Sequence, residues 1–458
     1  MLRKVLIANR GEIALSIFRN CKELGVETVA IYSDVDRDQP VVYLADSAIC
    51  VGPGKSSDSY LNVSNILTAA LETGCDAIHP GYGFLSENGD FAEKVESCGL
   101  KLIGPSSRVI KLMGDKLSAR TLMEENKVPV VPGCNEAIVS KEQLYETADR
   151  IGFPVLLKAS AGGGGKGMRK VYKKEDLLPL WEITKKEALV SFANDEIYME
   201  KLIENPRHIE VQILADKFGN VVYLPERDCS IQRNNQKMIE ESPSRADKEL
   251  LKKMYASAVQ CAKASGYEGT GTVEFIVDKN DNYYFMEMNT RIQVEYPVTE
   301  MVTGVNLIKE QIRIASGLPL SVKQEDIKAD GHAIEIRINA QNPFDNFRPG
   351  CGEVTFFLAP GGLDTRFESS LYQGEKILPF YDSMIGKLIV KGRTRMDAIK
   401  KMRRAVEETI IDGVMTNLGF QYAILFDKDF IHGNIDTNYI SAKEKELIDG
   451  MSIFGKEE

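Results

Sequence analysis

The stretch 283–300, YYFMEMNTRIQVEYPVTE, alternates polar and apolar side chains. Read with the period of two that a β-strand imposes, it places on one face Glu287, Asn289, Arg291, Gln293 and Glu295. A solvated strand can show such alternation, but exposed strands usually carry Lys and Glu rather than an Asn-Arg-Gln series between carboxylates. We therefore interpret this face as a binding site.

A second predicted strand, GTVEFIVDKNDN, supplies a further carboxylate, Glu274. Together with Glu287 and Asn289 it offers hard oxygen ligands, which Mg²⁺ accepts while phosphate and water oxygens fill its other positions. The four histidines are far apart in sequence, at positions 79, 208, 332 and 432, and no H-E-x-x-H motif occurs. A histidine-rich zinc site is therefore not expected.

Residues 158–168, KASAGGGGKGM, hold four consecutive glycines between two lysines. Bare backbone N–H groups beside a lysine make a cradle for phosphate. The phosphate-loop pattern G-x-x-x-x-G-K-[ST] does not fit, because Ser160 stands at its first glycine and Gly167 at its hydroxyl position. The flanking segments PVLLKAS and MRKVYKKE are typical of strands and predict a hairpin. A flap over phosphates and a flexible surface hairpin both remain open from this stretch alone.

Composition describes an ordinary globular chain of 458 residues, 43% hydrophobic and 27% charged, long enough for two to four domains. The formal net charge of -10 argues against a general nucleic-acid binder. Eight scattered cysteines without a C-x-x-C pair suit a reducing cytosol. The start, MLRKVLIANRGE, has too short an apolar run for a signal peptide, and no segment has the length of a membrane span. We expect a cytoplasmic protein.

The N-terminal pattern predicts a strand, a turn at Asn9–Gly11, an amphipathic helix and a strand ending at Asp34, a β-α-β unit of Rossmann type. Its turn has one glycine, so a structural role is favoured over dinucleotide binding. The segment NILTAALETGCDAIHP adds a helix and a strand. Later, a turn at Phe218–Asn220 predicts antiparallel sheet, and Thr394 predicts the N-cap of a structural helix.

The order and density of the motifs identify a family. They are IANRGEIA, HPGYGFLSEN, MGDK, KASAGGGGKGM, YMEK, ENPRHIE, ERDCSIQ, EMNTRIQVE, PVTE, IEIRINA and YDSMIGKLI. With them the chain resembles biotin carboxylase, the ATP-grasp subunit of acetyl-CoA carboxylase and related carboxylases, from Met1 to about residue 446. The resemblance implies an α/β and α+β multidomain fold, with a Rossmann-like domain at 1–114, an ATP-grasp domain at 115–330 with a glycine-rich lid at about 131–203, a mixed C-terminal domain at 331–446 and a tail at 447–458.

The resemblance also implies a site, carried over residue by residue. ATP would contact Lys116, Lys158, Gly164, Gly165, Glu200, Lys201, Ile203, His208, Asn235, Glu274 and Glu287. Magnesium or manganese would be held by Glu274, Glu287 and Asn289. Bicarbonate would be surrounded by Lys237, Arg291, Gln293, Val294 and Glu295, and biotin would lie near Tyr82 and Arg337. The implied catalytic residues are Arg291, Glu295, Lys237 and Arg337, with Glu295 as the base that deprotonates bicarbonate on the way to carboxyphosphate.

Two positions depart from the family's usual pattern. Asn235 stands where many members have His, and Tyr296 follows Glu295 where His is common. Neither change affects the implied metal ligands or base. The family is often a homodimer, and Arg19 and Glu23 match its interface positions, where Leu363 replaces a common Phe.

The biotin carrier and the carboxyltransferase are expected on other chains. The sequence has no A-M-K-M-like lysine motif for biotin attachment and no extension of carboxyltransferase size. We therefore expect a separate biotin carboxyl carrier protein and a separate carboxyltransferase. Three alternatives stay open: a subunit of pyruvate or another acyl-CoA carboxylase, another ATP-grasp ligase that forms an acyl phosphate, and a nucleotide-binding regulatory protein without turnover.

Overall fold

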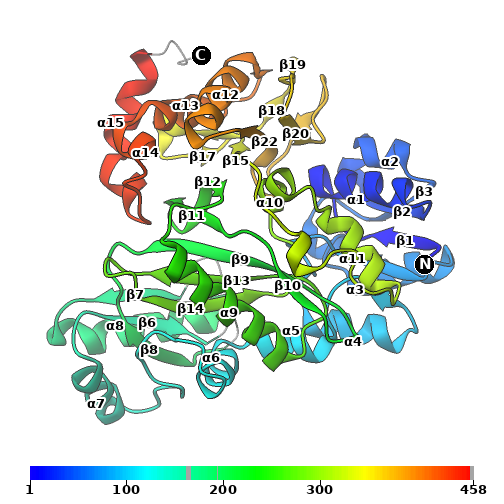
Figure 1. Cartoon of the computed structure of the whole chain (residues 1–458). Coiled ribbons are helices and arrows are strands. Elements are labelled where there is room, and N and C mark those ends of the chain that lie inside the picture. Colours follow the sequence, from blue (N-terminus) through cyan, green and yellow to red (C-terminus); the bar gives the residue numbers. More distant parts are fainter. Residues whose placement is uncertain (161–166, 193, 454–458) are drawn as a thin grey trace.

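The computed structural model describes residues 1–160, 167–192 and 194–453. Figure 1 shows an N-terminal lobe in blue, a central lobe in green with a smaller lobe in cyan and teal beside it, and a C-terminal lobe in yellow to red. The predicted mixed α/β multidomain architecture is confirmed. Within the described residues, no helix combines the length and the apolar character that a membrane crossing requires.

The N-terminal lobe is built on a five-stranded parallel sheet of strand order β3-β2-β1-β4-β5. Its strands are β1 (Lys4–Ile7), β2 (Glu27–Ser33), β3 (Ser47–Gly52), β4 (Ala77–His79) and β5 (Lys101–Leu102). Its helices are α1 (Gly11–Glu23), α2 (Pro40–Leu44), α3 (Val63–Glu72) and α4 (Gly89–Ser97). The predicted strand-helix-strand unit is confirmed, because β1 and β2, which precede and follow α1 in the sequence, pair in parallel.

A nine-stranded sheet forms the centre of the molecule. Its order is β14-β13-β9-β11-β12-β15-β22-β20, with β10 paired to β9. The strands are β9 (Arg207–Ala215), β10 (Val221–Tyr223), β11 (Arg227–Arg233), β12 (Gln236–Ser242), β13 (Gly269–Val277), β14 (Tyr283–Asn289), β15 (His332–Asn339), β20 (Thr365–Ser369) and β22 (Met384–Gly392). The turn predicted at Phe218–Asn220 joins β9 and β10 in an antiparallel pair, as expected.

The lid is a small sheet of order β7-β6-β8. Its elements are α7 (Lys141–Ile151), β6 (Val155–Ala159), β7 (Met168–Val171), α8 (Lys174–Phe192) and β8 (Ile197–Lys201). The strands on either side of the glycine run pair as a hairpin, as predicted. The second strand is shorter than expected, because α8 begins at Lys174 within the segment MRKVYKKE. Gly164 and Gly165 lie outside the described residues.

The alternating stretch is a strand only as far as Asn289. Residues 290–295 continue as a loop, and α10 (Tyr296–Thr303) begins directly afterwards with a proline in its first turn. The prediction of one continuous strand face up to Glu295 is therefore wrong. Pro297 explains the change, since proline fits the first turn of a helix but cannot donate to a sheet.

Helices cover the sheets and link the lobes. They are α5 (Ser107–Gly114), α6 (Lys116–Glu125), α9 (Lys248–Ser265), α11 (Leu307–Ala315), α12 (Arg395–Glu408), α13 (Leu418–Phe426), α14 (Lys428–His432) and α15 (Tyr439–Ile453). Short strands complete the C-terminal lobe: β16 (Gln341–Asn342), β17 (Arg348–Pro349), β18 (Gly352–Glu353), β19 (Phe356–Leu358), β21 (Lys376–Ile377) and β23 (Ile410–Asp412). Thr394 caps α12 as predicted, accepting a hydrogen bond from the Asp397 N–H.

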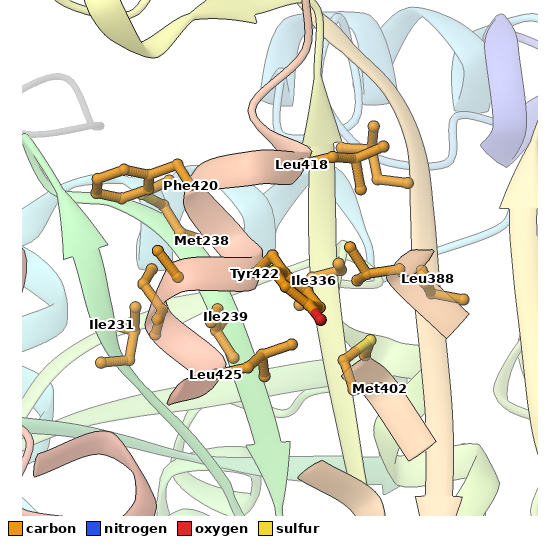
Figure 2. Close-up of a cluster of buried hydrophobic side chains, with 14 of the residues drawn as sticks. Ile231, Met238, Ile239, Ile336, Leu388, Met402, Leu418, Phe420, Tyr422 and Leu425 are labelled. Carbon is orange, nitrogen blue, oxygen red and sulfur yellow. The ribbon is translucent and has the colours of Figure 1, made fainter. Parts of the chain in front are cut away.

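The C-terminal core lies against one face of β12, β15 and β22. Figure 2 shows Ile336 and Leu388 from the sheet packed against Met402 of α12 and Leu425 of α13. These side chains are fully buried. Because β15 alternates, its other side chains, including Arg337, face away from this core and toward the site described next.

Candidate active site

One lysine joins three strands of the central sheet. Lys237, on β12, donates to Glu210 at 2.6 Å and to Glu274 at 2.9 Å. It also donates to Glu295 at 2.6 Å, from the loop that follows β14. All three carboxylates are buried, and Arg227 donates from its Nε to Glu210 at 2.5 Å. Lys237 therefore brings the predicted metal carboxylate and the predicted base to one ammonium group.

The charges of this cluster fix the protonation state of Glu295. Burial would raise its pKa, but the attraction of Lys237, Arg337 and Arg227 together holds the pKa below its ordinary value. Burial likewise would lower the pKa of Lys237, yet the carboxylates hold it well above its usual range. Glu295 is therefore an ionised carboxylate at neutral pH, which is the form that a general base needs.

A second cation lies against the same carboxylate. Arg337, on β15, donates from Nη2 to Glu295 at 3.0 Å and from Nε to Glu240 at 2.6 Å. Burial raises the pKa of Glu240 to about 7, although Arg337 acts to lower it. The guanidinium is thus fixed between a carboxylate of the neighbouring strand β12 and the predicted base in the loop after β14.

The predicted metal ligands face one another across two strands. Glu274 and Glu287 are direct partners in the antiparallel pair of β13 and β14, and Thr272 pairs with Asn289. Asn289 donates from Nδ2 to Glu274 at 3.0 Å. Burial raises the pKa of Glu287, and the negative charge of Glu274 raises it further. An ionised Glu274 that disfavours the charge of Glu287, with an amide oxygen beside the pair, fits a divalent cation with oxygen ligands.

Two more residues of the alternating stretch reach this cluster from the loop. Gln293 donates to Glu274 at 2.6 Å. Arg291 donates from Nη2 to the Oδ1 of Asn289 at 3.0 Å and from Nε to Glu87 at 2.9 Å. The structure therefore brings together the side chains that the alternation singled out, although a loop rather than a strand carries three of the five.

The predicted nucleotide lysines lie where the lid meets the central lobe. Lys158, on β6, is buried and pairs with Glu200 of β8 at 3.0 Å. Arg120 pairs with the other oxygen of Glu200 at 3.1 Å. Lys116, at the start of α6, lies 4.0 Å from Glu287, and burial lowers its pKa against the attraction of that carboxylate. Two cations therefore approach the metal carboxylates from the lid side.

His208 is part of the carboxylate cluster. Its Nε2 lies 3.2 Å from Glu274 and 3.6 Å from Glu210, and its Nδ1 lies 2.9 Å from the amide nitrogen of Gln232. Burial would lower the pKa of His208, but the attraction of Glu274 and the contacts of Nε2 with Glu210 and Glu274 together raise the pKa to about 9. The imidazole is thus cationic at neutral pH, and its contact with ATP stays a prediction.

Three other predicted nucleotide residues have structural explanations of their own. Lys201 donates to the carbonyl of Gly152 at 3.0 Å, so its ammonium is held against the lid backbone. Ile203 is half-buried beyond the end of β8. Asn235 lies with Asn234 in the two-residue turn between β11 and β12, at φ values of 63° and 50°, and asparagine tolerates this left-handed conformation. The turn therefore explains the asparagine, and nucleotide contact at these residues stays a prediction.

Tyr82 lies on the loop after β4. Asn9 holds this loop by donating from Nδ2 to the carbonyls of Pro80 and Tyr82, each at 2.7 Å. The Tyr82 hydroxyl donates to Glu12 at the start of α1. A biotin contact at Tyr82 stays a prediction.

Sequence reasoning missed several members of the cluster. They are Glu12, Glu87, Glu210, Arg227, Glu240 and Lys387. Period-two reading of the segment RHIEVQILA on β9 could have found Glu210, because His208, Glu210 and Gln212 alternate there with buried apolar residues. The segment QKMIEES on β12, which carries Glu240, shows no comparable alternation, because Glu240 and Glu241 are adjacent and face opposite sides of the sheet.

Comparison with known proteins decides the family. Three family models match: "Biotin carboxylase, N-terminal domain" over residues 1–110, "Carbamoyl-phosphate synthase L chain, ATP binding domain" over 115–323 and "Biotin carboxylase C-terminal domain" over 335–442. Biotin carboxylase 1 of Bacillus subtilis is 54% identical over 442 residues, which are 96% of this chain and 98% of that protein. The chain belongs to the biotin carboxylase family. It is an ATP-dependent ligase with an ATP-grasp domain.

Other biotin carboxylase relatives serve different carboxylases. A pyruvate carboxylase subunit of Methanothermobacter thermautotrophicus is 47% identical over 459 residues, which are 100% of this chain and 93% of that protein. A solved structure of similar fold is the biotin carboxylase domain dimer of the 2-oxoglutarate carboxylase of Hydrogenobacter thermophilus, in complex with MgADP, ADP and bicarbonate. Its TM-score is 0.94 and its identity 47%, and the match covers 98% of this chain and 99% of that one.

Proposed function

We propose that this chain uses ATP and bicarbonate to carboxylate biotin on a separate carrier protein, by way of carboxyphosphate. The observation that carries the proposal is the shared ammonium of Lys237. It joins Glu295, which is ionised and suited to act as a base, to Glu274, which belongs to the oxygen-ligand set. A phosphoryl acceptor and a phosphoryl donor can therefore be held at one point of the sheet.

On the nucleotide side, Glu274, Glu287 and Asn289 would hold Mg²⁺ or Mn²⁺, which neutralises phosphate charge when bound. Lys116 and Lys158 place two further positive charges at the lid side of that set. Phosphoryl transfer needs positioning and charge neutralisation more than covalent help, and these residues supply both.

On the bicarbonate side, Lys237 and Arg291 would hold the anion while Glu295 removes its proton. A bicarbonate oxygen then attacks the γ-phosphorus, ADP leaves, and carboxyphosphate forms. Carboxyphosphate breaks down to CO₂ and phosphate, and the phosphate takes the N1′ proton of biotin. Arg337 would stabilise the enolate oxygen that results, and a fixed cation of this kind contributes roughly 10²–10³ in rate. The nitrogen N1′ then attacks CO₂ to give carboxybiotin.

The final acceptor belongs to partner proteins. We propose acetyl-CoA carboxylase as one setting for this chain. The named relatives serve pyruvate and 2-oxoglutarate carboxylases at similar identity, so those acceptors are the second candidates. A carboxyltransferase assay with each acceptor and this chain's own partner proteins separates them.

Assembly as a homodimer is also proposed. Leu363 is 86% exposed, and Phe356 and Leu358 of β19 are exposed nearby in the chain. Arg19 pairs with Glu368 at 3.2 Å, and Glu23 pairs with Lys309. Light scattering is expected to give the dimer mass at micromolar concentration, and a monomer mass would contradict the proposal.

We further propose the domain division 1–114, 115–330 and 331–446, which the ranges of the family models support. A cytoplasmic location is proposed as well. It is supported by the state of the cysteines, all eight of which are free.

The decisive experiment measures phosphate release from ATP by the purified chain. We expect turnover that depends on bicarbonate and rises when free biotin is added. Turnover that depends on another carboxylate and ignores biotin would instead identify a different ATP-grasp ligase. An absence of phosphate release under all these conditions would identify a regulatory protein.

A further inference from the structure

Lys387 lies in the middle of β22 with its side chain fully buried. In the sheet it is the direct partner of Arg337, so the two side chains share the face that carries the site. Lys387 donates to the main-chain carbonyl of Val294 at 2.7 Å. It therefore holds the backbone of the loop that ends at Glu295.

The same ammonium reaches the N-terminal lobe. Lys387 Nζ lies 3.2 Å from the Oε1 of Glu12, in the first turn of α1. The same oxygen accepts the hydroxyl hydrogen of Tyr82. The ammonium also lies 4.6 Å from the ring centroid of Tyr296 and 5.7 Å from that of Tyr82, where cation–π attraction contributes.

These contacts form a continuous path between two loops. It runs from the carbonyl of Val294 through Lys387 and Glu12 to the hydroxyl of Tyr82. One end is the loop assigned above to bicarbonate, and the other is the loop assigned to biotin. These two loops come from different lobes, and neither is part of a sheet at these residues.

Stability alone does not explain a buried ion pair here. Hydrophobic side chains of similar volume often replace such a pair without loss, because burying both charges is costly. Burial acts to lower the pKa of Lys387, but its acidic neighbours, Glu12 first among them, together hold the pKa above its ordinary value. Burial raises the pKa of Glu12 to about 7, although Lys387 acts to lower it. The ammonium is therefore charged, and its donors are directed at the two loops.

We propose that Lys387 and Glu12 are positioning residues that set the bicarbonate loop and the biotin loop at a fixed separation, so that CO₂ released at one is captured at the other. This inference rests on the proposed function. Within the described residues, neither side chain contacts a residue assigned above to ATP or to the metal. Breaking the pair is expected to uncouple ATP cleavage from biotin carboxylation, because a displacement of about 1 Å can cost roughly a hundredfold in a positioned reaction.

The test compares two rates in one preparation: bicarbonate-dependent ATP cleavage and formation of carboxybiotin from free biotin. Lys387→Met keeps the length of the side chain and removes its charge. Because Lys237 and Arg337 still hold the Glu295 carboxylate in this variant, we expect ATP cleavage within about threefold of wild type. Carboxybiotin formed per ATP cleaved should be lower by about tenfold or more, with a higher KM for biotin. The KM for Mg-ATP is expected to stay unchanged.

A second variant keeps the test valid if Lys387→Met does not fold. Glu12→Gln retains volume and an acceptor for Tyr82 but removes the charge that faces Lys387, and we expect the same uncoupling in weaker form. Lys391→Met is the matched control, because Lys391 lies on the same strand and pairs with Asp330 at 3.1 Å on the periphery. It should leave the ratio unchanged.

Three outcomes separate the ideas. A lowered ratio in Lys387→Met or Glu12→Gln, with the control unchanged, supports the positioning role. An equal fall of both rates, or an unchanged ratio in the folded variants, would overturn it. Failure of the wild-type chain to carboxylate biotin at all would instead overturn the proposed function.

Discussion

The two faces of β15 are held by different kinds of contact. On one face Ile336 is packed among apolar side chains from α12 and α13, where many contacts are individually weak. On the other face Arg337 forms ion pairs with two carboxylates, Glu240 and Glu295. The first face is fully buried and Arg337 on the second is only partly exposed, yet only the first face could be repacked with other side chains of similar volume. The difference teaches that in this strand stability and chemistry occupy opposite faces and should respond to substitution separately.

The largest effect is expected on the charged face. Glu295→Gln keeps the size of the side chain but removes the base, so bicarbonate-dependent ATP cleavage should fall by about 10²-fold or more. Nucleotide affinity should be nearly unchanged, because Glu295 is outside the oxygen-ligand set. Steady-state phosphate release with varied Mg-ATP measures both quantities.

Glu287→Gln is the companion variant for that measurement. It weakens a charged oxygen ligand, so affinity for Mg-ATP and turnover should fall together.

The assignment of Glu295 as the base has its own contradicting outcome. Near-full biotin carboxylation by Glu295→Gln at neutral pH would show that water or the phosphate product takes the proton of bicarbonate instead.

On the apolar face the expected loss is in stability. Ile336→Ala should lower the free energy of unfolding by about 2–5 kcal/mol, because it removes buried carbon and leaves a cavity. Below the unfolding temperature, kcat and KM should stay close to wild type. Urea denaturation with kinetics on the same sample tests the separation, and a kinetic defect comparable to that of Glu295→Gln would break the comparison between the faces.

His79 is a buried histidine that stays neutral, and it affects stability without belonging to the charged site. His79, at the end of β4, is fully buried, and burial lowers its pKa to about 3. The unfolded chain takes up this proton near pH 6.5 while the folded chain does not, so stability should fall as the pH falls below 6.5. The loss attributable to His79 between pH 6.5 and 5 is about 2 kcal/mol.

His79→Asn removes the titrating group and keeps an acceptor for the Gly81 N–H, which donates to the His79 Nδ1 at 3.1 Å. Denaturant titrations at several pH values should show a shallower acid slope in the variant. Identical slopes in the two proteins would mean that other groups account for the acid sensitivity.

The smallest effect is expected at the cap of α12. Thr394 accepts one hydrogen bond from the Asp397 N–H, and Thr394→Ala should cost about 1 kcal/mol of stability. Thermal unfolding measures it, with Thr394→Ser, which keeps the hydroxyl, as control. A loss in Thr394→Ser as large as that in Thr394→Ala would assign the effect to the methyl group rather than to the cap.

The pattern of neighbouring residues was sufficient to predict several elements of the fold. The β-α-β unit at the N-terminus and the hairpin around the glycine run follow from periodicity and turn residues, which are properties of neighbouring positions. The pairing of β12 with β15 was not predictable in this way, because it joins residues such as Ile239 and Ile336 that are far apart in the chain.

Part of the site was predictable for the same reason. Glu274 and Glu287 lie on strands next to each other in sequence, and their alternation marks one face. Glu240, Glu12 and Lys387 escaped because none of them belongs to a clear polar alternation in the sequence, and only tertiary contact reveals the partner of each. The strand reading of residues 290–295 was wrong, since the period of two was present but the proline at 297 turned the chain into a helix.

The continuous central sheet has a consequence for how the chain can be divided. The proposed boundary at residue 330 separates β12 from β15, yet these strands pair from Ile239 with Ile336 to Ser242 with Ala333. A chain shortened at residue 330 would leave the outer edge of β12 without its hydrogen-bonding partner, and open strand edges invite aggregation. Because the sheet is continuous across residue 330, we expect the central and C-terminal lobes to unfold together and a chain cut at this family-based boundary to aggregate.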